Sequence, residues 1–214
     1  MLSVENLTFR YRRGGEELFD DLSYAFEPGR VTAVTGASGR GKSTLLYVLG
    51  LMLTPLRGTV TLQGNNVSAA ADAERSRIRA ESIGFVFQDS ALDPTRTILD
   101  SVTEPALYAG WSRSRAQEQG RVLLERMGVG NRADHMPGEI SGGQAQRVAV
   151  CRSLVTDPAV VLADEPTGNL DQANAEGVLT ALSEAAGAGA LARTVVIATH
   201  DPFVIEFADE VLAL

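Results

Sequence analysis

One octapeptide constrains the fold of this chain more than any other feature. Residues 36–43 read GASGRGKS and fit the pattern G-x-x-x-x-G-K-[ST], in which glycines allow backbone N–H groups to surround phosphate oxygens. An apolar run at 31–35 precedes it and is typical of a buried strand, and residues 44–49 follow it with a helical pattern. Because the motif requires this strand–loop–helix order, we predict a phosphate-binding loop rather than a glycine-rich turn that matches by chance.

Several side chains of this loop are assigned roles by their chemistry. Lys42 is expected to reach the β- and γ-phosphates, and the hydroxyl of Ser43 is expected to ligate Mg²⁺. Arg40 either adds a phosphate contact or points to solvent. The residues of the loop expected to contact nucleotide are Gly36, Ala37, Ser38, Gly39, Arg40, Gly41, Lys42 and Ser43.

Length and composition limit the class of protein. The 214 residues are 44% hydrophobic, enough for one domain with a sizeable core, and the net charge of −8 argues against a nucleic-acid partner. One cysteine excludes an internal disulfide framework and suits a reducing compartment. The N-terminus has no signal pattern, and the longest apolar stretch, 45–53, is too short to span a bilayer. We therefore expect no direct membrane insertion, and any membrane role would come through another protein.

Strand and helix patterns alternate along the chain. The predicted strands cover residues 2–11, 21–27, 31–35, 59–62, 83–87, 160–163 and 194–198. The predicted helices after the phosphate loop cover residues 114–127, 142–155 and 172–185. Strands that alternate with helices of this length predict an α/β fold with a parallel sheet.

The stretch at 89–140 differs from the rest because it has little strand signal. We predict that it is a mostly helical insertion within a single domain spanning 1–214. Residues 185–190, rich in alanine and glycine, are predicted to form a flexible connection. Cys151 shares a helical face with two valines and is predicted to be a core residue rather than a redox centre.

A second set of polar residues follows the apolar run at 160–163. Asp164 and Glu165 would stand at the carboxyl edge of the parallel sheet, where open α/β folds bind ligands. Asp164 is expected to hold magnesium, directly or through water, and Glu165 to orient and polarise the water that attacks the γ-phosphate. Helix capping or a solvated turn would also explain the pair, but the phosphate loop favours the catalytic interpretation.

Two further polar residues end predicted strands. His200 follows the strand at 194–198, and its position favours a contact to the γ-phosphate over a structural role. Gln88 follows the strand at 83–87 and could touch the metal or the attacking water, or be an ordinary strand-terminal amide. Because parallel strands end at one edge, these side chains are expected to lie near the phosphate loop.

The run Ser-Gly-Gly-Gln at 141–144 completes an ordered series of motifs. With the residues above, the chain resembles the nucleotide-binding domains of ABC (ATP-binding cassette) proteins over essentially its whole length. Thr44 extends the loop to the family's Walker A motif, and Asp171 ends its D-loop. The resemblance implies a P-loop NTPase core with a parallel sheet, N-terminal antiparallel β strands and an inserted α-helical subdomain at 89–140. It also implies ATP and Mg²⁺ as ligands.

The resemblance assigns roles that the residues alone do not. Tyr11 occupies the position of an aromatic that stacks on adenine, although a core tyrosine on an alternating strand is the simpler interpretation. Ser141 is predicted to cap the next helix and leave backbone N–H groups exposed at its start. By resemblance this turn grips the γ-phosphate of ATP bound to a second subunit; in a monomer it is a cap facing solvent. The residues involved are Ser141, Gly142, Gly143 and Gln144, and Asp171 would communicate across the same interface.

The function implied by the resemblance is ATP hydrolysis that drives a membrane transporter. Two copies are expected to pair head to tail around two ATP–Mg²⁺, with separate integral membrane permease subunits that keep the chain at the cytoplasmic face. Residues 84–88 and 166–171 resemble the lipoprotein-releasing, macrolide-exporting and cell-division branch, although peptide importers share parts of these strings. The segment at 89–140 is expected to dock the permease.

Two other functions remain open at this point. One is a regulatory ATPase that moves a membrane partner controlling a cell-wall enzyme, with no cargo. The other is a cassette for DNA repair or translation, which a single compact acidic chain fits poorly. Since the chain ends soon after its last predicted strand, we expect no C-terminal regulatory extension.

Overall fold

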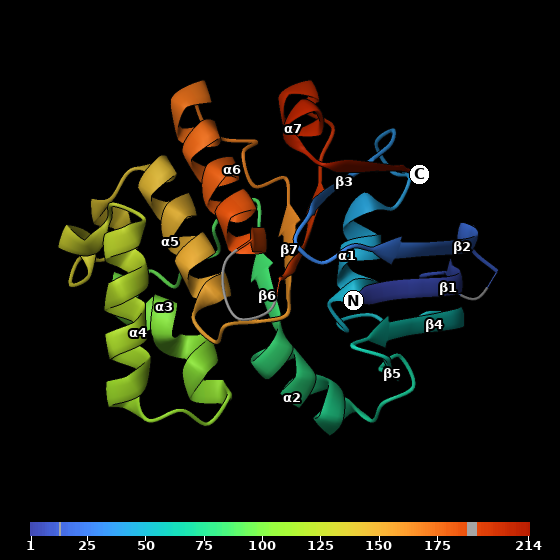
Figure 1. Ribbon diagram of the computed structural model, residues 1–214, viewed down its shortest axis with the longest axis horizontal. Helices are drawn as coiled ribbons and strands as arrows, with labels where there is room; N and C mark the ends of the chain where they lie inside the picture. The colour runs from blue at the N-terminus through green and yellow to red at the C-terminus, as the bar shows by residue number, and fades with distance from the viewer. Residues whose placement is uncertain (13, 188–191) are drawn as a thin grey trace.

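The computed structural model describes residues 1–12, 14–187 and 192–214, which form two sheets and the helices around them. A four-stranded antiparallel sheet has the order β2-β1-β4-β5, and a five-stranded parallel sheet has the order β6-β7-β8-β3-β9. Figure 1 shows the antiparallel sheet on one side of the molecule, helices α3 to α6 on the other, and the parallel sheet between them. The predicted α/β P-loop NTPase fold is thus confirmed.

The antiparallel sheet is formed by the N-terminal third of the chain. Its strands are β1 (Leu2–Phe9), β2 (Leu18–Phe26), β4 (Arg57–Leu62) and β5 (Asn65–Asn66). The prediction was wrong at two boundaries: β1 ends before residue 11, and β2 begins before residue 21. Left-handed residues Asn6, Phe19 and Asp21 accompany register shifts between β1 and β2, and such irregularities hide the period-two alternation.

The parallel sheet carries the carboxyl edge at which the predicted polar residues meet. Its strands are β3 (Val31–Thr35), β6 (Ile83–Val86), β7 (Val160–Asp164), β8 (Thr194–Ala198) and β9 (Glu210–Ala213). Every residue of β7 and β8 is buried, which explains their continuous apolar runs. The edge strand β9 was not predicted, because only one of its four residues is buried.

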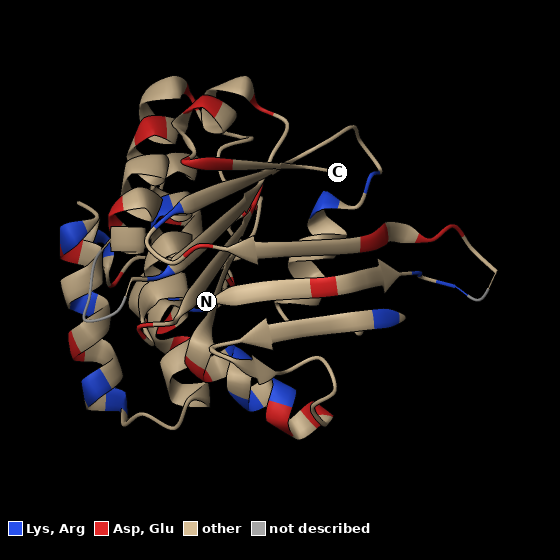
Figure 2. Ribbon diagram, turned by 45° about the vertical axis from the view of Figure 1, so that its right-hand side comes forward, with Lys and Arg blue, Asp and Glu red and all other residues tan. Residues whose placement is uncertain are grey.

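Helices cover both faces of the parallel sheet. They are α1 (Lys42–Leu49), α2 (Asp72–Ser82), α3 (Ile98–Tyr108), α4 (Arg113–Arg126), α5 (Gly142–Leu154), α6 (Gln172–Gly187) and α7 (Pro202–Phe207). Helix α2 was not predicted, because none of its residues is buried and it has no apolar stripe. Acidic and basic residues are interspersed along α2 and α4 in Figure 2, as expected for exposed helix faces.

Two predictions about the chain's organisation have different outcomes. Residues 185–187 belong to α6 and not to a flexible connection, whereas 188–190 lie outside the described residues. The segment at 89–140 contains α3 and α4 and no strand. That this segment acts as a unit of its own stays a prediction.

Apolar packing on the two faces of the parallel sheet holds the phosphate loop in place. On one face, α1 lies between the two sheets, and its Leu45, Leu46 and Leu49 are completely buried. Burial of each such side chain contributes about 1.5–3 kcal/mol, so the helix that follows the loop is firmly anchored. On the other face, α5 and α6 pack around Cys151, which is buried as predicted. None of the helices described is both long and apolar enough to cross a membrane.

Candidate functional site

The phosphate loop connects β3 to α1, and its backbone requires glycine. Gly36, Gly39 and Gly41 have φ angles of 144°, 83° and 96°, a region that other L residues rarely adopt. A Cβ at Gly41 would lie 2.9 Å from the ring of Phe19. The ammonium Nζ of Lys42 donates a hydrogen bond to the carbonyl oxygen of Gly36 (2.9 Å), so this side chain folds back over the loop.

Two predicted residues that are far apart in sequence meet below this loop. The hydroxyl of Ser43 donates to Oδ1 of Asp164 at 2.9 Å, and the hydroxyl of Tyr47 donates to Oδ2 at 3.4 Å. Asp164 is only 8% exposed, and its burial raises the pKa of the carboxyl, a shift that the Ser43 hydrogen bond opposes. Tyr47 was missed by the sequence analysis, although its place one helical turn after Ser43 signals a shared face.

Glu165 and His200 meet where β7 and β8 end. Nδ1 of His200 donates to Oε1 of Glu165 at 2.6 Å, and the Thr199 hydroxyl donates to Oε2 at 3.2 Å. The backbone of Glu165 is left-handed (φ 45°), and its N–H donates to the carbonyl oxygen of Ala198 (2.9 Å). Such a conformation outside glycine marks a constrained position. Thr199 is a second contact that the sequence analysis did not identify.

These elements surround one cavity of about 860 Å³. The predicted site residues that line it are Tyr11, Gly36, Ala37, Ser38, Gly39, Gly41, Lys42, Ser43, Thr44, Gln88, Glu165 and His200. Asp164 contributes from below through Ser43. Arg40 is not among the described residues that line the cavity, nor are the residues of the turn at 141–144 or Asp171.

Tyr11 differs from its predicted placement. The residue follows β1 and does not belong to that strand, and it is 63% exposed, so the interpretation as a core tyrosine is wrong. Its ring packs edge-on against Phe9, with centroids 4.8 Å apart, and its hydroxyl shares a hydrogen bond with Oγ1 of Thr44 (2.7 Å). An exposed ring held in this way at the cavity leaves a face available for stacking.

The turn at 141–144 forms the predicted helix cap. Oγ of Ser141 accepts from the N–H of Gln144 (3.3 Å), and Oε1 of Gln144 accepts from the N–H of Ser141 (3.0 Å). This reciprocal capping box begins α5. A Cβ at Gly143 would lie 2.4 Å from Oδ1 of Asn174, and Asp171 accepts hydrogen bonds from that same asparagine. The turn is therefore packed tightly against the start of α6.

The donors near the phosphate loop suit Mg²⁺. Ser43, Asp164 and Gln88 offer a hydroxyl, a carboxylate and an amide, the hard oxygen ligands that this ion takes. Within the part of the chain that the structure describes, no group of three or more His, Cys, Asp and Glu side chains forms a metal cage. Few protein ligands combined with substrate phosphates are typical of magnesium sites, so the residues present fit the ion.

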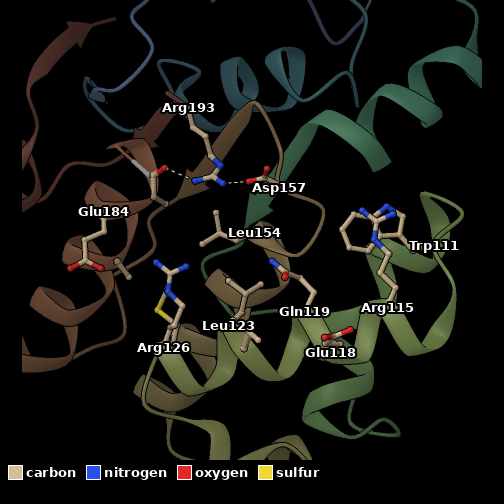
Figure 3. Close-up of a pocket in the computed structure, with 14 residues that line it drawn as sticks. Trp111, Arg115, Glu118, Gln119, Leu123, Arg126, Leu154, Asp157, Glu184 and Arg193 are labelled. Atoms are coloured by element: carbon tan, nitrogen blue, oxygen red, sulfur yellow. Dashed lines mark hydrogen bonds and ion pairs between the residues drawn. The ribbon is translucent and has the colours of Figure 1, made fainter. Parts of the chain in front are cut away.

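A second cavity lies away from these residues, on the side of α4 and α6 (Figure 3). Its volume is about 650 Å³, and Leu123 and Leu154 contribute to its apolar lining. The guanidinium of Arg115 lies 3.6 Å from the ring centroid of Trp111 at one end. Arg115 therefore contacts Trp111 of its own chain. This cavity and the predicted nucleotide site share no described lining residue.

Comparison with known proteins gives one consistent result. The family described as ABC transporter matches residues 19–168. The lipoprotein-releasing system ATP-binding protein LolD of Myxococcus xanthus is 44% identical over 203 residues, covering 94% of this chain and 90% of LolD. The macrolide export ATP-binding/permease protein MacB of Chlorobaculum tepidum is 38% identical over 216 residues, all of this chain but only 33% of MacB.

A solved structure is similar over the whole chain. The ATP-binding cassette MJ0796, described as a dimer in a post-hydrolysis state with ADP and Pi, superposes with a TM-score of 0.87. The two sequences are 32% identical, and the match covers 100% of this chain and 94% of MJ0796. The sequence matches and the structural match therefore point to the same family, the ATP-binding cassettes of ABC transporters.

Proposed function

Since the chain belongs to the ABC transporter family and is one of its ATP-hydrolysing cassettes, we propose that it pairs head to tail around two ATP molecules and drives a separate membrane permease. The observation that supports this most is the cavity in which the phosphate loop, Gln88, Glu165 and His200 converge. These residues come from four segments of the sequence, yet they surround one space large enough for a nucleotide.

Nucleotide binding is assigned to the loop and to Tyr11. The inward-facing N–H groups of the glycine-rich loop and the ammonium of Lys42 hold the β- and γ-phosphates. The exposed ring of Tyr11 stacks on adenine, and its hydroxyl remains on Thr44. Ser43, Asp164 and Gln88 would hold Mg²⁺. When bound, that ion neutralises charge on the phosphate oxygens.

Hydrolysis is assigned to the pair at the ends of β7 and β8. Glu165 orients a water molecule and accepts its proton as the water oxygen attacks the γ-phosphorus. The bond from that phosphorus to the bridging oxygen breaks, which leaves ADP and inorganic phosphate. His200 holds Glu165 through Nδ1, and its largely exposed ring (77%) is free to present Nε2 to the γ-phosphate.

A second copy completes the site. At the start of α5 the capping box pairs the N–H groups of Ser141 and Gln144 and leaves those of Gly142 and Gly143 to attract an anion, but this turn does not line the cavity of its own chain. In an isologous pair, the turn of each copy would close the other copy's cavity over the γ-phosphate, with Asp171 beside it. The description of MJ0796 as a dimer supports this arrangement.

The permease is proposed to dock on the segment at 89–140 and its neighbour α2. A groove of about 580 Å³ lies between α2 and α3, where Arg77 and Arg79 face Pro105 and Tyr108. Tyr108 is 73% exposed and Arg77 is also exposed, so an aromatic and a cationic side chain are available to a partner, whereas Arg79 donates to the carbonyl oxygen of Leu51. This contact would keep the chain at the inner face of the cell membrane. The names of the relatives favour a permease that handles lipoproteins or exported compounds, and a complex without cargo is the alternative.

Affinity purification from detergent-solubilised membranes tests the pairing with a permease. We expect the tagged chain to recover an integral membrane protein, and Tyr108→Ala to reduce that recovery without changing ATP hydrolysis by the isolated chain. Val211→Ala, an exposed apolar residue on β9 outside the proposed docking segment, is the matched control and should recover the partner fully. Recovery of a permease with a large outer domain would support the lipoprotein-releasing branch, and recovery of no membrane protein would contradict the proposal.

A further inference from the structure

Arg152, near the end of α5, holds a turn of unusual backbone. The turn spans residues 87–91, and its Ser90 and Ala91 both have left-handed backbones, with φ of 56° and 49°. The two terminal nitrogens of Arg152 donate to the carbonyl oxygens of Ser90 (2.7 Å) and Ala91 (2.6 Å). A planar guanidinium can serve two adjacent acceptors at once, which an ammonium cannot do with the same geometry. Arg152 thus fixes a conformation that these residues would rarely adopt alone.

Gln146 holds the other end of the same turn. The side chain is 3% exposed, and its Nε2 donates to the carbonyl oxygen of Phe87 at 3.1 Å. Below this contact the backbones of β6 and α5 are in direct contact, because a Cβ at Gly84 would lie 2.1 Å from the carbonyl oxygen of Ser153. The turn, β6 and α5 are therefore packed and hydrogen-bonded as one unit.

The unit joins two parts of the nucleotide site. Gln88 lies in the turn and lines the cavity of its own chain, whereas Ser141 caps the opposite end of α5. The helix spans about 20 Å at 1.5 Å per residue. α5 also packs against α3, α4 and α6 (Figure 1). A tilt of α5 would therefore displace α3 and α4, the helices of the 89–140 segment.

Aromatic residues of the turn, β6 and α1 extend the connection toward the proposed metal ligands. The ring of Phe87 packs on Phe85, with centroids 4.4 Å apart, and Phe85 packs on Tyr47 at 5.8 Å. Tyr47 contacts Asp164. The position of the turn is thus related through packed side chains to the carboxylate below the phosphate loop.

We propose that Arg152 and Gln146 are positioning residues that fix the 87–91 turn, hold Gln88 toward the phosphate loop and couple its orientation to that of the Ser141-capped helix. The inference rests on the proposed function of Gln88, and it adds the residues through which Gln88 and the turn at 141–144 act together. Arg152 and Gln146 themselves do not line the cavity among the residues described, so they act through the turn.

A double-mutant cycle on ATP hydrolysis tests the coupling. We expect Arg152→Ala to lower kcat about tenfold while the KM for ATP stays within about twofold, since Arg152 contacts no residue of the phosphate loop. Gln88→Ala should have a similar effect. The double variant should be no slower than Gln88→Ala alone, because both changes remove one function. Arg121→Ala is the control and should match the wild type in kcat and KM.

Trp111 provides a readout that does not depend on turnover. It is the single tryptophan of the chain and lies in the helical segment. We expect ATP and Mg²⁺ to change its emission in the wild type, and the change to be at least about twofold smaller in Arg152→Ala. An additive loss of kcat in the double variant, or an unaltered emission change, would overturn the inference.

Outcomes of the two proposals can be told apart. A wild-type chain that neither binds nor hydrolyses ATP would contradict the proposed function, whereas an active wild type with additive variants contradicts only the coupling. Should Arg152→Ala fail to fold, the same cycle is run with Arg152→Lys, which keeps the positive charge but has one donor nitrogen in place of the two that contact Ser90 and Ala91. Non-additivity with Gln88→Ala then supports the coupling, and additivity overturns it.

Discussion

Nδ1 of His200 lies 2.6 Å from Oε1 of Glu165, which places the two polar residues that follow neighbouring strands β7 and β8 in direct contact. Glu165 is mostly buried and His200 mostly exposed, with side-chain exposures of 16% and 77%. The carboxylate of Glu165 is thus held by hydrogen bonds from Thr199 and His200, while the imidazole of His200 lines the cavity. This geometry suits a base that needs a fixed direction and a histidine that can reach the substrate.

Replacement of Glu165 by glutamine separates binding from hydrolysis. Glu165→Gln keeps the size of the side chain and an oxygen that can accept from His200, but it removes the proton acceptor. We expect ATP to bind normally, kcat to fall by about 100-fold or more, and the ATP-bound dimer to accumulate. Size-exclusion chromatography with ATP and Mg²⁺ checks this. A variant that stays monomeric at saturating ATP would count against the dimer.

Removal of the Lys42 ammonium should weaken nucleotide binding. Of the described loop residues that line the cavity, Lys42 alone has a cationic side chain. A hydrogen bond to a charged group contributes ~1.5–3 kcal/mol, so Lys42→Ala should raise the Kd for ATP by about 10- to 100-fold. Titration calorimetry measures this.

Arg40→Ala distinguishes the two interpretations of Arg40, and we expect a Kd close to wild type because that residue does not line the cavity.

Gly143 allows the turn at 141–144 to pack on α6. In Gly143→Ala the new Cβ would lie 2.4 Å from Oδ1 of Asn174, so the asparagine and its bond to Asp171 must shift. We expect the monomer to bind ATP as before while ATP-dependent pairing is lost. Gly177→Ala on α6 is the matched control, since a Cβ there meets nothing within 4 Å. Analytical ultracentrifugation with ATP should show a dimer for the control and a monomer for Gly143→Ala.

Burial raises the pKa of the Cys151 thiol to about 12, from an ordinary value of 9.0. Since the unfolded chain ionises first as the pH rises, the stability associated with the neutral thiol is fully present below pH 9 and is lost between pH 9 and about 12. Urea denaturation should therefore show a steeper fall in the free energy of unfolding for wild type than for Cys151→Ala in this range. Equal slopes would contradict the assignment.

A thiol reagent at pH 8 should modify Cys151 only in the unfolded protein.

Much of the site was predictable because its parts lie in short contiguous runs. The glycine positions of the phosphate loop and the acids at the end of β7 follow from local geometry. Tyr47 and Thr199 were missed because neither belongs to a recognisable run. α2 and β9 were also missed, since elements without a buried apolar pattern leave no periodic signal.

The sequence by itself determined the phosphate loop, the apolar strands of the parallel sheet and the Ser141 cap, because backbone conformation, capping and periodicity depend on neighbouring residues. Only the tertiary structure decided that Ser43 meets Asp164, that His200 meets Glu165, and that the turn at 141–144 stays outside its own chain's cavity. Those relations depend on strand order and on how helices pack against the sheet. Contacts between residues so far apart in the chain are set by the packing of the whole domain rather than by any local pattern.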